Sequence, residues 1–235
     1  MSKGKLYLIP SPLGENNPAE TIPAEVLSIA CSLRCFVVEE LRTARRVLSR
    51  YGLKGHIDEL EFHTLNEHTA PEEVQAMLPL FDNGDVGLIT EAGLPAVADP
   101  GAALVALCHR NGIQVMPLTG PSSLMLALMA SGVNGQSFAF CGYLPAKTEE
   151  RRSALRSVEK LSSSRNQSQI IIETPYRNDS LFADMLQVLS GDTRLCVAAD
   201  ITLETQFIRT LTVAQWRKQA GFSIGKRPCV FIILL

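Results

Sequence analysis

Several short motifs that mark common enzyme classes are missing from the sequence. It has no GxGxxG for a dinucleotide and no GxxxxGK followed by Ser or Thr for a nucleoside triphosphate. GxSxG, HExxH and the Cys-His spacings of a structural zinc site are missing as well. These absences exclude the commonest hydrolase, kinase and metalloprotease interpretations.

Long apolar runs are also missing. The longest, such as Val230–Leu235, are far shorter than the ~20 residues that span a bilayer, and Leu6–Ile9 is too short for a signal peptide. We therefore expect a cytoplasmic protein with no membrane association. At 46% hydrophobic and 20% charged residues, the 235-residue chain can bury the core of one large domain or two modest ones.

Paired cysteines and an excess of charge are lacking too. The six cysteines include no CxxC pair, and Cys31 and Cys35 are spaced like one helical turn. Most have apolar neighbours, so we expect buried free thiols and no metal site. Because the net charge is −2, RNA binding must depend on a local basic patch or on a dimer that combines two such patches.

Short apolar runs alternate with amphipathic segments, which is typical of an α/β fold with parallel strands. In the first half we expect strands at Lys5–Pro10, Cys35–Glu39, Phe62–Leu65, Asp85–Thr90 and Gln114–Pro117. The helices expected there are Pro23–Ala30, Thr43–Tyr51, Pro71–Phe81 and Gly101–Asn111. These segments together form a first α/β domain, residues 1–117.

Residues 118–235 form the second expected α/β domain. The helices expected there are Ser122–Ser131, Glu149–Leu161, Ser180–Leu189 and Thr212–Ala220. The expected strands are Phe138–Cys141, Gln169–Glu173, Arg194–Ala199 and Cys229–Leu234, with a hairpin arm at Leu203–Leu211.

Two loops rich in glycine and proline follow strands, at the position where open α/β sheets bind ligands. The first, Thr90–Gly101, contains Gly93, which tolerates a positive φ and a close backbone approach. The second, Pro117–Ser123, leads into a helix start that suits a polar ligand group. Taken alone, either loop could equally be a rigid structural turn.

With further motifs, these loops resemble those of the tetrapyrrole methylases. Within that group the chain is similar to the bacterial 2'-O-ribose methyltransferases that act on a cytidine of small-subunit ribosomal RNA. The resemblance covers almost the whole chain. The matching motifs are Leu6–Gly14, Glu39–Arg45, Asn66–His68, Glu91–Pro95, Asp99–Gly101, Gly120–Ser123, Ala130–Gly132, Gly142–Pro145 and Glu173–Arg177.

The resemblance implies a homodimer with S-adenosylmethionine in a cleft between two α/β domains, the tetrapyrrole methylase fold. The cofactor contacts implied by position are Gly93, Leu94, Pro95, Val97, Ser123, Leu124, Glu173, Ala199, Asp200 and Pro228. The chain departs from the family pattern at Glu40 and Glu91, where the family has Asp, at Leu41, where it has Thr, and at Ala199–Asp200, where it has Arg-Glu.

A ribose hydroxyl is a poor nucleophile and benefits from a base. The candidate catalytic residues are Glu40, His68 and Glu91. His68 is equally compatible with a backbone-bonded loop histidine, and Glu40 with a structural ion pair to a nearby arginine. The candidate substrate contacts are Arg42, Arg45, Arg46, Tyr143 and Arg177.

Arg42, Arg46 and Arg50 recur every fourth residue, so they share one helical face. This face suits a phosphate backbone, although a solvated helix face explains it equally well. Lys147, Arg151 and Arg152 form a second basic group that is also able to position a phosphate.

We expect a methyltransferase that modifies a ribose 2'-hydroxyl, with ribosomal RNA or the small ribosomal subunit as its partner. Two alternatives stay open: a small-molecule, tetrapyrrole-like methyltransferase, and a protein that binds the cofactor or RNA without turnover. Pro10–Pro12 is not the glycine-rich loop expected of a tetrapyrrole enzyme. The altered acids at Glu40, Glu91 and Asp200 are the only support for the non-catalytic alternative.

Overall fold

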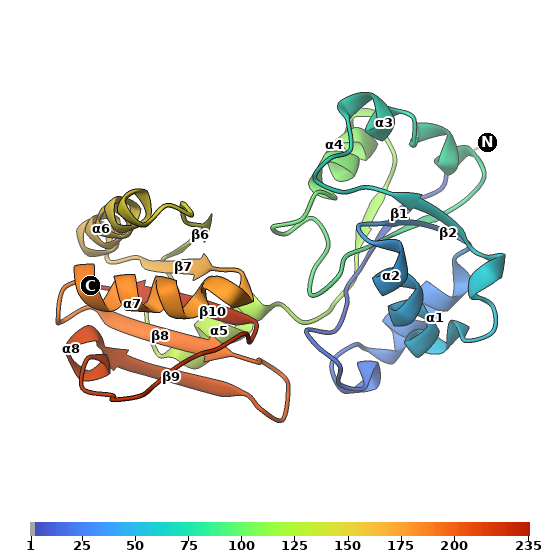
Figure 1. Cartoon of the computed structure of the whole chain (residues 1–235). Coiled ribbons are helices and arrows are strands. Elements are labelled where there is room, and N and C mark those ends of the chain that lie inside the picture. Colours follow the sequence, from blue (N-terminus) through green and yellow to red (C-terminus); the bar gives the residue numbers. More distant parts are fainter. Residues whose placement is uncertain (1–2) are drawn as a thin grey trace. The chain divides into compact units, whose positions relative to one another are not determined.

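The computed structural model describes residues 3–235, which divide into two compact units (Figure 1). The first unit ends at Ser122 and the second comprises Ser123–Leu235. The boundary predicted after residue 117 lies before this division, at the end of the last strand of the first unit. Within the described residues, no helix is both long and apolar enough to cross a membrane.

The first unit is built on a five-stranded sheet in the order β3-β2-β4-β1-β5, and all neighbouring strands run parallel. Its strands are β1 (Leu6–Ile9), β2 (Cys35–Val38), β3 (Glu61–Thr64), β4 (Val86–Ile89) and β5 (Val115–Pro117). β4 is buried along its whole length because helices cover both faces of the sheet.

Helices cover the two faces in two groups, as right-handed crossovers require (Figure 1). The chain passes from β1 to β2 to β3 in one direction across the sheet, and the helices that connect these strands lie on one face. They are α1 (Ala24–Ser32) and α2 (Leu41–Leu48), with the short helical turns η1 (Pro18–Glu20), η2 (Ser49–Leu53) and η3 (Ile57–Glu59). The path β3-β4-β5 runs back and places α3 (Pro71–Gln75), η4 (Leu78–Asp82) and α4 (Ala102–Arg110) on the other face.

Two helices of this unit differ from the sequence prediction for local reasons. The helix expected over 71–81 is interrupted, because Pro79 lacks the N–H that a continuous helix needs and ends α3 early. α2 begins at Leu41 rather than Thr43, because the Glu40 carboxylate accepts hydrogen bonds from the amides of Arg42 and Thr43.

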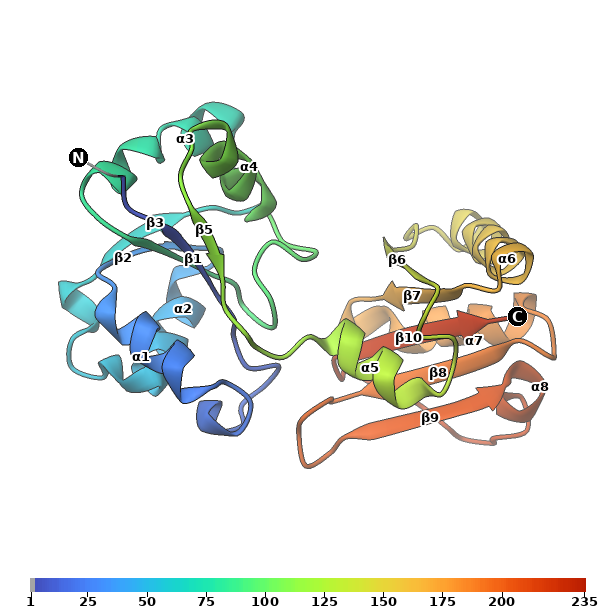
Figure 2. The same ribbon diagram turned by 180° about the vertical axis from the view of Figure 1, so that it is seen from behind.

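The second unit has a five-stranded sheet in the order β6-β7-β10-β8-β9. Its strands are β6 (Phe138–Tyr143), β7 (Ser168–Ile172), β8 (Arg194–Ala199), β9 (Phe207–Thr212) and β10 (Cys229–Leu234). One face packs against α6 (Thr148–Arg165), α7 (Asn178–Val188) and α8 (Val213–Trp216), and η5 (Pro175–Arg177) precedes α7. α5 (Ser123–Ser131) packs against β10, β8 and β9 (Figure 2).

The parallel pairing expected for both domains is wrong for most of this second sheet. Only β6 and β7 pair in parallel, whereas β10 runs antiparallel to both β7 and β8, and β8 runs antiparallel to β9. The chain between β8 and β9, Asp200–Gln206, is too short for the crossover that a parallel pair needs. The last expected helix shrinks to α8 because residues 217–221 are exposed and bury nothing.

Candidate functional site

The candidate site of the first unit lies at the carboxyl ends of its parallel strands. Crossovers from β1 and β4, which are neighbours in the sheet, leave toward opposite faces, and ligands of open α/β sheets bind at such a switch point. The loops that follow these two strands are joined there. The amide of Ser11 donates to the carbonyl of Gly93 (2.8 Å), and the amide of Gly93 donates to the carbonyl of Ser11 (3.0 Å).

Further contacts hold the same loops in one shape. The buried Ser11 hydroxyl donates to the carbonyl of Thr90 (2.7 Å), and the Tyr51 hydroxyl donates to the carbonyl of Pro10 (2.5 Å). Gly93 has a φ of +76°, which a residue with a Cβ rarely adopts. Leu94, Pro95 and the exposed Val97 continue this loop, so the four cofactor contacts expected in this unit are adjacent on a braced segment.

Glu39, which sequence reasoning did not propose as a catalytic residue, is a half-buried carboxylate at this edge. It follows β2, and the hydroxyl of Thr90 donates to it at 3.4 Å. Burial raises the pKa of the half-buried Glu39, and the carboxylates of Asp99 and Glu91 raise it further. A half-buried carboxyl with a raised pKa at a strand end is a candidate for proton transfer.

The three expected catalytic residues have different surroundings. Both carboxylate oxygens of Glu40 accept amide bonds at the start of α2, and these bonds lower its pKa. Glu91 is exposed beside Glu39. His68 lies in the exposed loop after β3, where its amide donates to the side chain of Asn66 (2.9 Å) and its ring is 3.5 Å from Glu67.

The arginines of α2 surround two adjacent surface hollows. One hollow is lined by Glu40, Arg42, Thr43 and Arg46. The other lies where the loop after β1, the arginine face of α2 and the loop after β4 meet. Its lining residues are Pro12, Leu13, Gly14, Glu15, Thr43, Arg46, Val47, Arg50, Glu91 and Ala92. Arg46 thus contributes to both hollows, and Glu91 shares one of them.

Three of these arginines form ion pairs with nearby carboxylates, and the partners differ. Arg46 and Arg50 both reach the exposed Glu15 carboxylate, at 3.3 and 3.6 Å. Arg45 forms an ion pair with Asp58 and lies over the Phe62 ring. Exposed pairs of this kind stabilise little, so the guanidinium groups can exchange Glu15 for a phosphate at small cost.

The candidate site of the second unit lies at one end of its sheet. Glu173 follows β7, Ala199 ends β8 and is followed by Asp200, and Pro228 precedes β10. The register places these positions side by side, since Val230 pairs with Ile172 and Cys229 pairs with Ala199. The amide of Asp200 donates to the carbonyl of Pro228 (3.0 Å).

α5 brings Ser123 and Leu124 to the same end of this sheet. The far end of the helix is fixed by Thr210 of β9, whose hydroxyl donates to the carbonyl of Ser131 (2.7 Å). Because the helix runs along β8 and β9, its first residues lie toward the Asp200 loop (Figure 2). The second group of expected cofactor contacts is therefore also clustered.

Glu173 has a buried oxygen that finds no partner among the described residues. Its Oε1 accepts hydrogen bonds from the amide of Thr174 (2.7 Å) and from Arg177 Nε (2.9 Å) and Nη2 (2.6 Å). Its Oε2 is buried and accepts none. A native protein rarely leaves a buried carboxylate oxygen unsatisfied, so this atom fits a ligand that supplies a donor.

Unpartnered atoms and backbone strain recur around this end. The Asn178 Oδ1 and the Thr202 Oγ1 are also buried without a partner among the described residues. Asp200 and Thr202 have φ values of +51° and +74°. Strained backbone of this kind clusters at ligand sites. Asn178 and Thr202 belong to no sequence motif, and only the three-dimensional structure shows them as candidates.

The residues expected at the substrate surface differ in their surroundings. Tyr143 ends β6 and is 57% exposed, which leaves its ring available for stacking. Arg177, in contrast, is held by Glu173. Arg151 does not fit the phosphate-binding role expected for it, because its side chain turns inward to the buried Asp184 of α7 (Nε to carboxylate 2.7 Å). Arg152 also donates to Asp184 (2.7 Å) but is 25% exposed, so its phosphate-binding role stays a prediction.

Comparison with known proteins adds independent information. A profile of the family described as Tetrapyrrole (Corrin/Porphyrin) Methylases matches residues 24–216. Ribosomal RNA small subunit methyltransferase I of Vibrio cholerae is 30% identical over 211 residues, which span 89% of this chain and 69% of that protein. The protein of the same name from Thermotoga maritima is 32% identical over 208 residues, 88% of this chain and 87% of that protein.

Solved structures with the same fold include two with low sequence identity. A uroporphyrin-III C-methyltransferase from Thermus thermophilus, complexed with S-adenyl homocysteine, has a TM-score of 0.59 and 14% identity, over 98% of this chain and 97% of that one. A conserved hypothetical protein from Aeropyrum pernix K1 has a TM-score of 0.70 and 14% identity, over 99% and 85%. At these identities the likeness establishes the fold.

Proposed function

The chain belongs to the tetrapyrrole methylase family and is an S-adenosylmethionine-dependent methyltransferase, and we propose that it methylates a ribose 2'-hydroxyl of small-subunit ribosomal RNA. The observation that carries the substrate is the similarity, at about 30% identity over nine tenths of the chain, to ribosomal RNA small subunit methyltransferases I. The arginine-lined hollows of the first unit support a nucleic-acid substrate.

We assign the cofactor contacts to two groups of residues. In the first unit they are Gly93, Leu94, Pro95 and Val97, and in the second they are Ser123, Leu124, Glu173, Ala199, Asp200 and Pro228. The buried Glu173 Oε2 supports this assignment, since a cofactor amino or hydroxyl group would satisfy it. When bound, S-adenosylmethionine supplies an activated methyl group, so the protein has to orient the acceptor hydroxyl and accept its proton.

Glu39 is the residue to which we assign this proton. It has the raised pKa that favours proton uptake, and its neighbours Thr90 and Glu91 lie at the switch point of the sheet. Glu40 serves as the cap of α2, with both oxygens engaged. Glu91 and His68 remain candidates for polarising the hydroxyl or for contacting the RNA.

Arg42, Arg45 and Arg46 are assigned to the RNA phosphates. Arg42 and Arg46 line the hollow that also contains Glu40, and all three lie on or beside one face of α2. Phosphate contacts fix the position of an RNA without reading its sequence. The exposed ring of Tyr143 is assigned to base stacking. Because its substrate is ribosomal RNA, we place the protein in the cytoplasm.

We further propose that two copies associate through the β6 face of the second sheet. β6 is an edge strand, and Phe138, Phe140 and Tyr143 are all exposed on it. The three side chains lie on one face of the sheet, because their register partners on β7 are Ser168, Ile170 and Ile172, which alternate along that strand. An edge strand with adjacent exposed aromatics is a surface that soluble proteins usually cover. Light scattering of the Phe140→Glu variant tests this: a monomer supports the assignment, and an unchanged dimer refutes it.

The activity test uses methyl-labelled S-adenosylmethionine with small ribosomal subunits that lack their native methylation, and with naked RNA in parallel. The expected result is label at one position where the RNA resists alkaline hydrolysis. Glu39→Gln and Glu40→Gln form a matched pair for the catalytic assignment. We expect Glu39→Gln to slow methyl transfer about 10²–10⁴-fold at unchanged cofactor affinity, and Glu40→Gln to retain most activity.

Other outcomes separate the parts of this proposal. Label in a small molecule but in no RNA, with cofactor bound, would refute the substrate. Activity lost in Glu40→Gln but retained in Glu39→Gln would reverse the assignment of the two acids. Bound cofactor with no transfer to any acceptor would favour the non-catalytic alternative.

A further inference from the structure

Three side chains with metal-binding chemistry meet at the amino-terminal ends of β2 and β3. Cys35 opens β2 and pairs with Glu61, and His63 pairs with Val37 two positions along. Because side chains alternate along a strand, Cys35, Glu61 and His63 all project from the same face of the sheet. Their ligand atoms lie within 4.8 Å of one another, and the His63 Nε2 is 2.8 Å from Glu61 Oε1.

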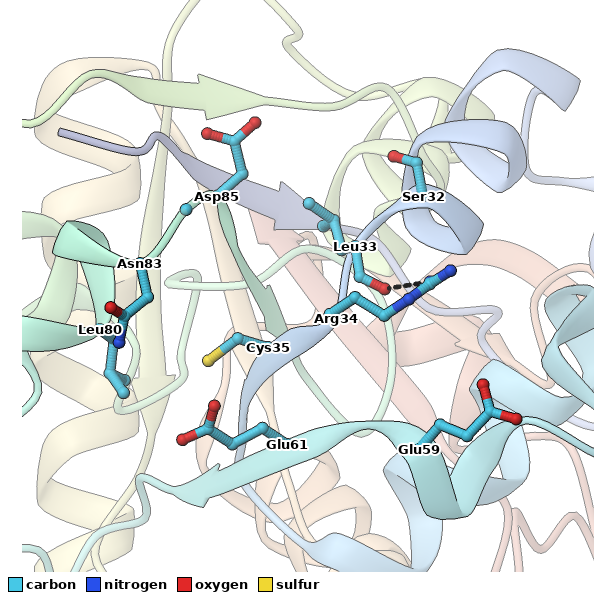
Figure 3. Close-up of a pocket in the computed structure, with 10 residues that line it drawn as sticks. Ser32, Leu33, Arg34, Cys35, Glu59, Glu61, Leu80, Asn83 and Asp85 are labelled. Atoms are coloured by element: carbon cyan, nitrogen blue, oxygen red, sulfur yellow. Dashed lines mark hydrogen bonds between the residues drawn. The ribbon is translucent and has the colours of Figure 1, made fainter. Parts of the chain in front are cut away.

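A cavity of about 450 Å³ lies beside this cluster and is lined by Cys35, Glu61, Leu80 and Asn83, among others. In Figure 3 the Cys35 sulfur and the Glu61 carboxylate point toward one another on the cavity side, while Arg34 and Glu59 point away from them. Cys35 and His63 are only half-buried. An ion and water molecules can therefore reach the Cys35 sulfur and the Glu61 carboxylate from the cavity, and the half-buried His63 ring is not enclosed.

We propose that Cys35, Glu61 and His63 bind one divalent transition metal, with Zn²⁺ the best fit. Thiolate, imidazole and carboxylate together are a ligand set that Zn²⁺ accepts, and three protein ligands leave a fourth position for water from the cavity. The ligands stand on two hydrogen-bonded strands, so their spacing is held by the sheet rather than by a mobile loop.

One other use of these residues fits the structure less well. An ion pair accounts for His63 and Glu61, and packing against the apolar core accounts for Cys35, but neither explains why the sulfur lies within 4.8 Å of both other ligand atoms.

The site is remote from the methyl-transfer residues within the same unit. Cys35 is the first residue of β2, whereas Glu39 follows its last. A metal there would tie β3, an edge strand that pairs only with β2, to the rest of the sheet. The bound metal would therefore link this edge to the rest of the sheet.

Metal titration of the full chain, freed of any affinity tag and treated with a chelator, tests the site. Competition against a zinc-responsive fluorescent indicator should show one tight equivalent of Zn²⁺. Cys35→Ser and His63→Gln should each weaken binding at least about 10-fold. Two control variants should bind as the wild type does: Cys31→Ser, a half-buried cysteine outside the cluster, and His56→Gln, an exposed histidine that also pairs with a glutamate.

Cobalt provides a second, spectroscopic measurement. Co²⁺ bound by the wild type should show the near-ultraviolet charge-transfer band of a thiolate ligand, and Cys35→Ser should lose it while Cys31→Ser keeps it. Glu61→Gln keeps the size of the side chain and should weaken binding without unfolding the protein, which the circular dichroism of the metal-free variants checks. Equal Zn²⁺ affinity in wild type and Cys35→Ser, or no binding by the wild type, would overturn the proposal.

Discussion

The buried ion pair between α6 and α7 gives a sharp test of how the second unit is held together. Arg151 and Asp184 have side chains only 4% and 5% exposed, and Arg152 donates to the other carboxylate oxygen. Arg151 also donates to the carbonyl of Ala146 and the hydroxyl of Ser180. Among the described residues, Asp184 is the only carboxylate paired with Arg151, so the change Asp184→Ala leaves the Arg151 guanidinium buried without a counter-ion.

The expected loss follows from this burial. Removing one partner of a buried pair costs about 3–5 kcal/mol, because the remaining charge is cut off from water as well as from its partner. Solvent screening does not reduce this figure here, since both groups are buried. With a urea dependence of about 2 kcal/mol per M, the unfolding midpoint should fall by about 1.5–2.5 M.

Urea unfolding followed by tryptophan fluorescence is the assay. Trp216 is the only tryptophan of the chain and is buried in the same unit, with its indole N–H donating to the carbonyl of Leu195 (2.8 Å). Its signal therefore reports the unfolding of the second unit. Glu150→Ala is the matched control, because it removes the exposed pair with Lys147 at the start of the same helix and should cost at most about 0.5 kcal/mol.

A second variant separates the uncompensated charge from lost packing. Arg151→Met combined with Asp184→Leu removes both charges, and it should recover much of the stability that Asp184→Ala alone loses. If Asp184→Ala lowers the free energy of unfolding by less than about 1 kcal/mol, the reasoning is refuted, because a buried guanidinium without a counter-ion should cost more than that. Folded Arg151→Met should keep its RNA affinity, because the Arg151 side chain is buried against Asp184; a lower affinity would contradict this assignment.

Three further predictions concern the two site edges. Partial burial raises the pKa of Asp179, but hydrogen bonds from the Ser223–Gly225 loop, including the Ile224 amide, outweigh it and hold the pKa below its usual value. Asp179→Asn should therefore destabilise at neutral pH, and the difference in melting temperature should shrink progressively as the pH falls from about 4 through the lowered pKa. Burial raises the pKa of Glu39, so the folded state binds its proton more tightly and Glu39→Gln should raise the melting temperature at neutral pH, with the gain shrinking in acid. A Cβ on Gly120 would lie 2.2 Å from the Pro10 Cβ, so Gly120→Ala should lower the free energy of unfolding by about 1–3 kcal/mol and weaken cofactor binding in calorimetry. Gly135 has open space around it, so Gly135→Ala should change neither quantity.

Most strands could be predicted from the sequence because apolar runs end at proline, glycine or acidic residues. β2, for example, ends where Glu39 and Glu40 begin, and β10 is an uninterrupted apolar run. The antiparallel order of the second sheet could not be predicted, since β10 inserts between β7 and β8 although it comes last in the chain. That insertion depends on contacts between distant segments, which local periodicity does not encode.

The site was harder to predict than the fold, because side-chain direction decides each role. Glu39 and Glu40 are neighbours of equal chemistry, yet the first faces Thr90 and the second turns back to cap α2. Arg151 looks like a surface cation in the sequence, and only its distance to Asp184, 33 positions away, shows that it is buried. Cys35 belongs to no CxxC pair, and its proposed co-ligands lie on another strand.

Strained backbone is common to the loops that carry the two groups of candidate cofactor contacts. Among the described residues, five non-glycine positions have a positive φ, and four of them lie in the loops 93–101 and 200–206: Ala96, Ala98, Asp200 and Thr202. Each costs about 1–3 kcal/mol and persists only where other contacts hold it. The Asp99 carboxylate provides such contacts in the first loop by accepting the amides of Ala96 (3.1 Å) and Gly101 (2.6 Å), and the Thr205 hydroxyl donates to Asp200 (2.9 Å) in the second. Loops braced in this way have already lost their conformational entropy in the folded protein, so a ligand that binds them need not order them again. Cofactor affinity should therefore depend on the bracing residues as much as on the residues that touch the cofactor.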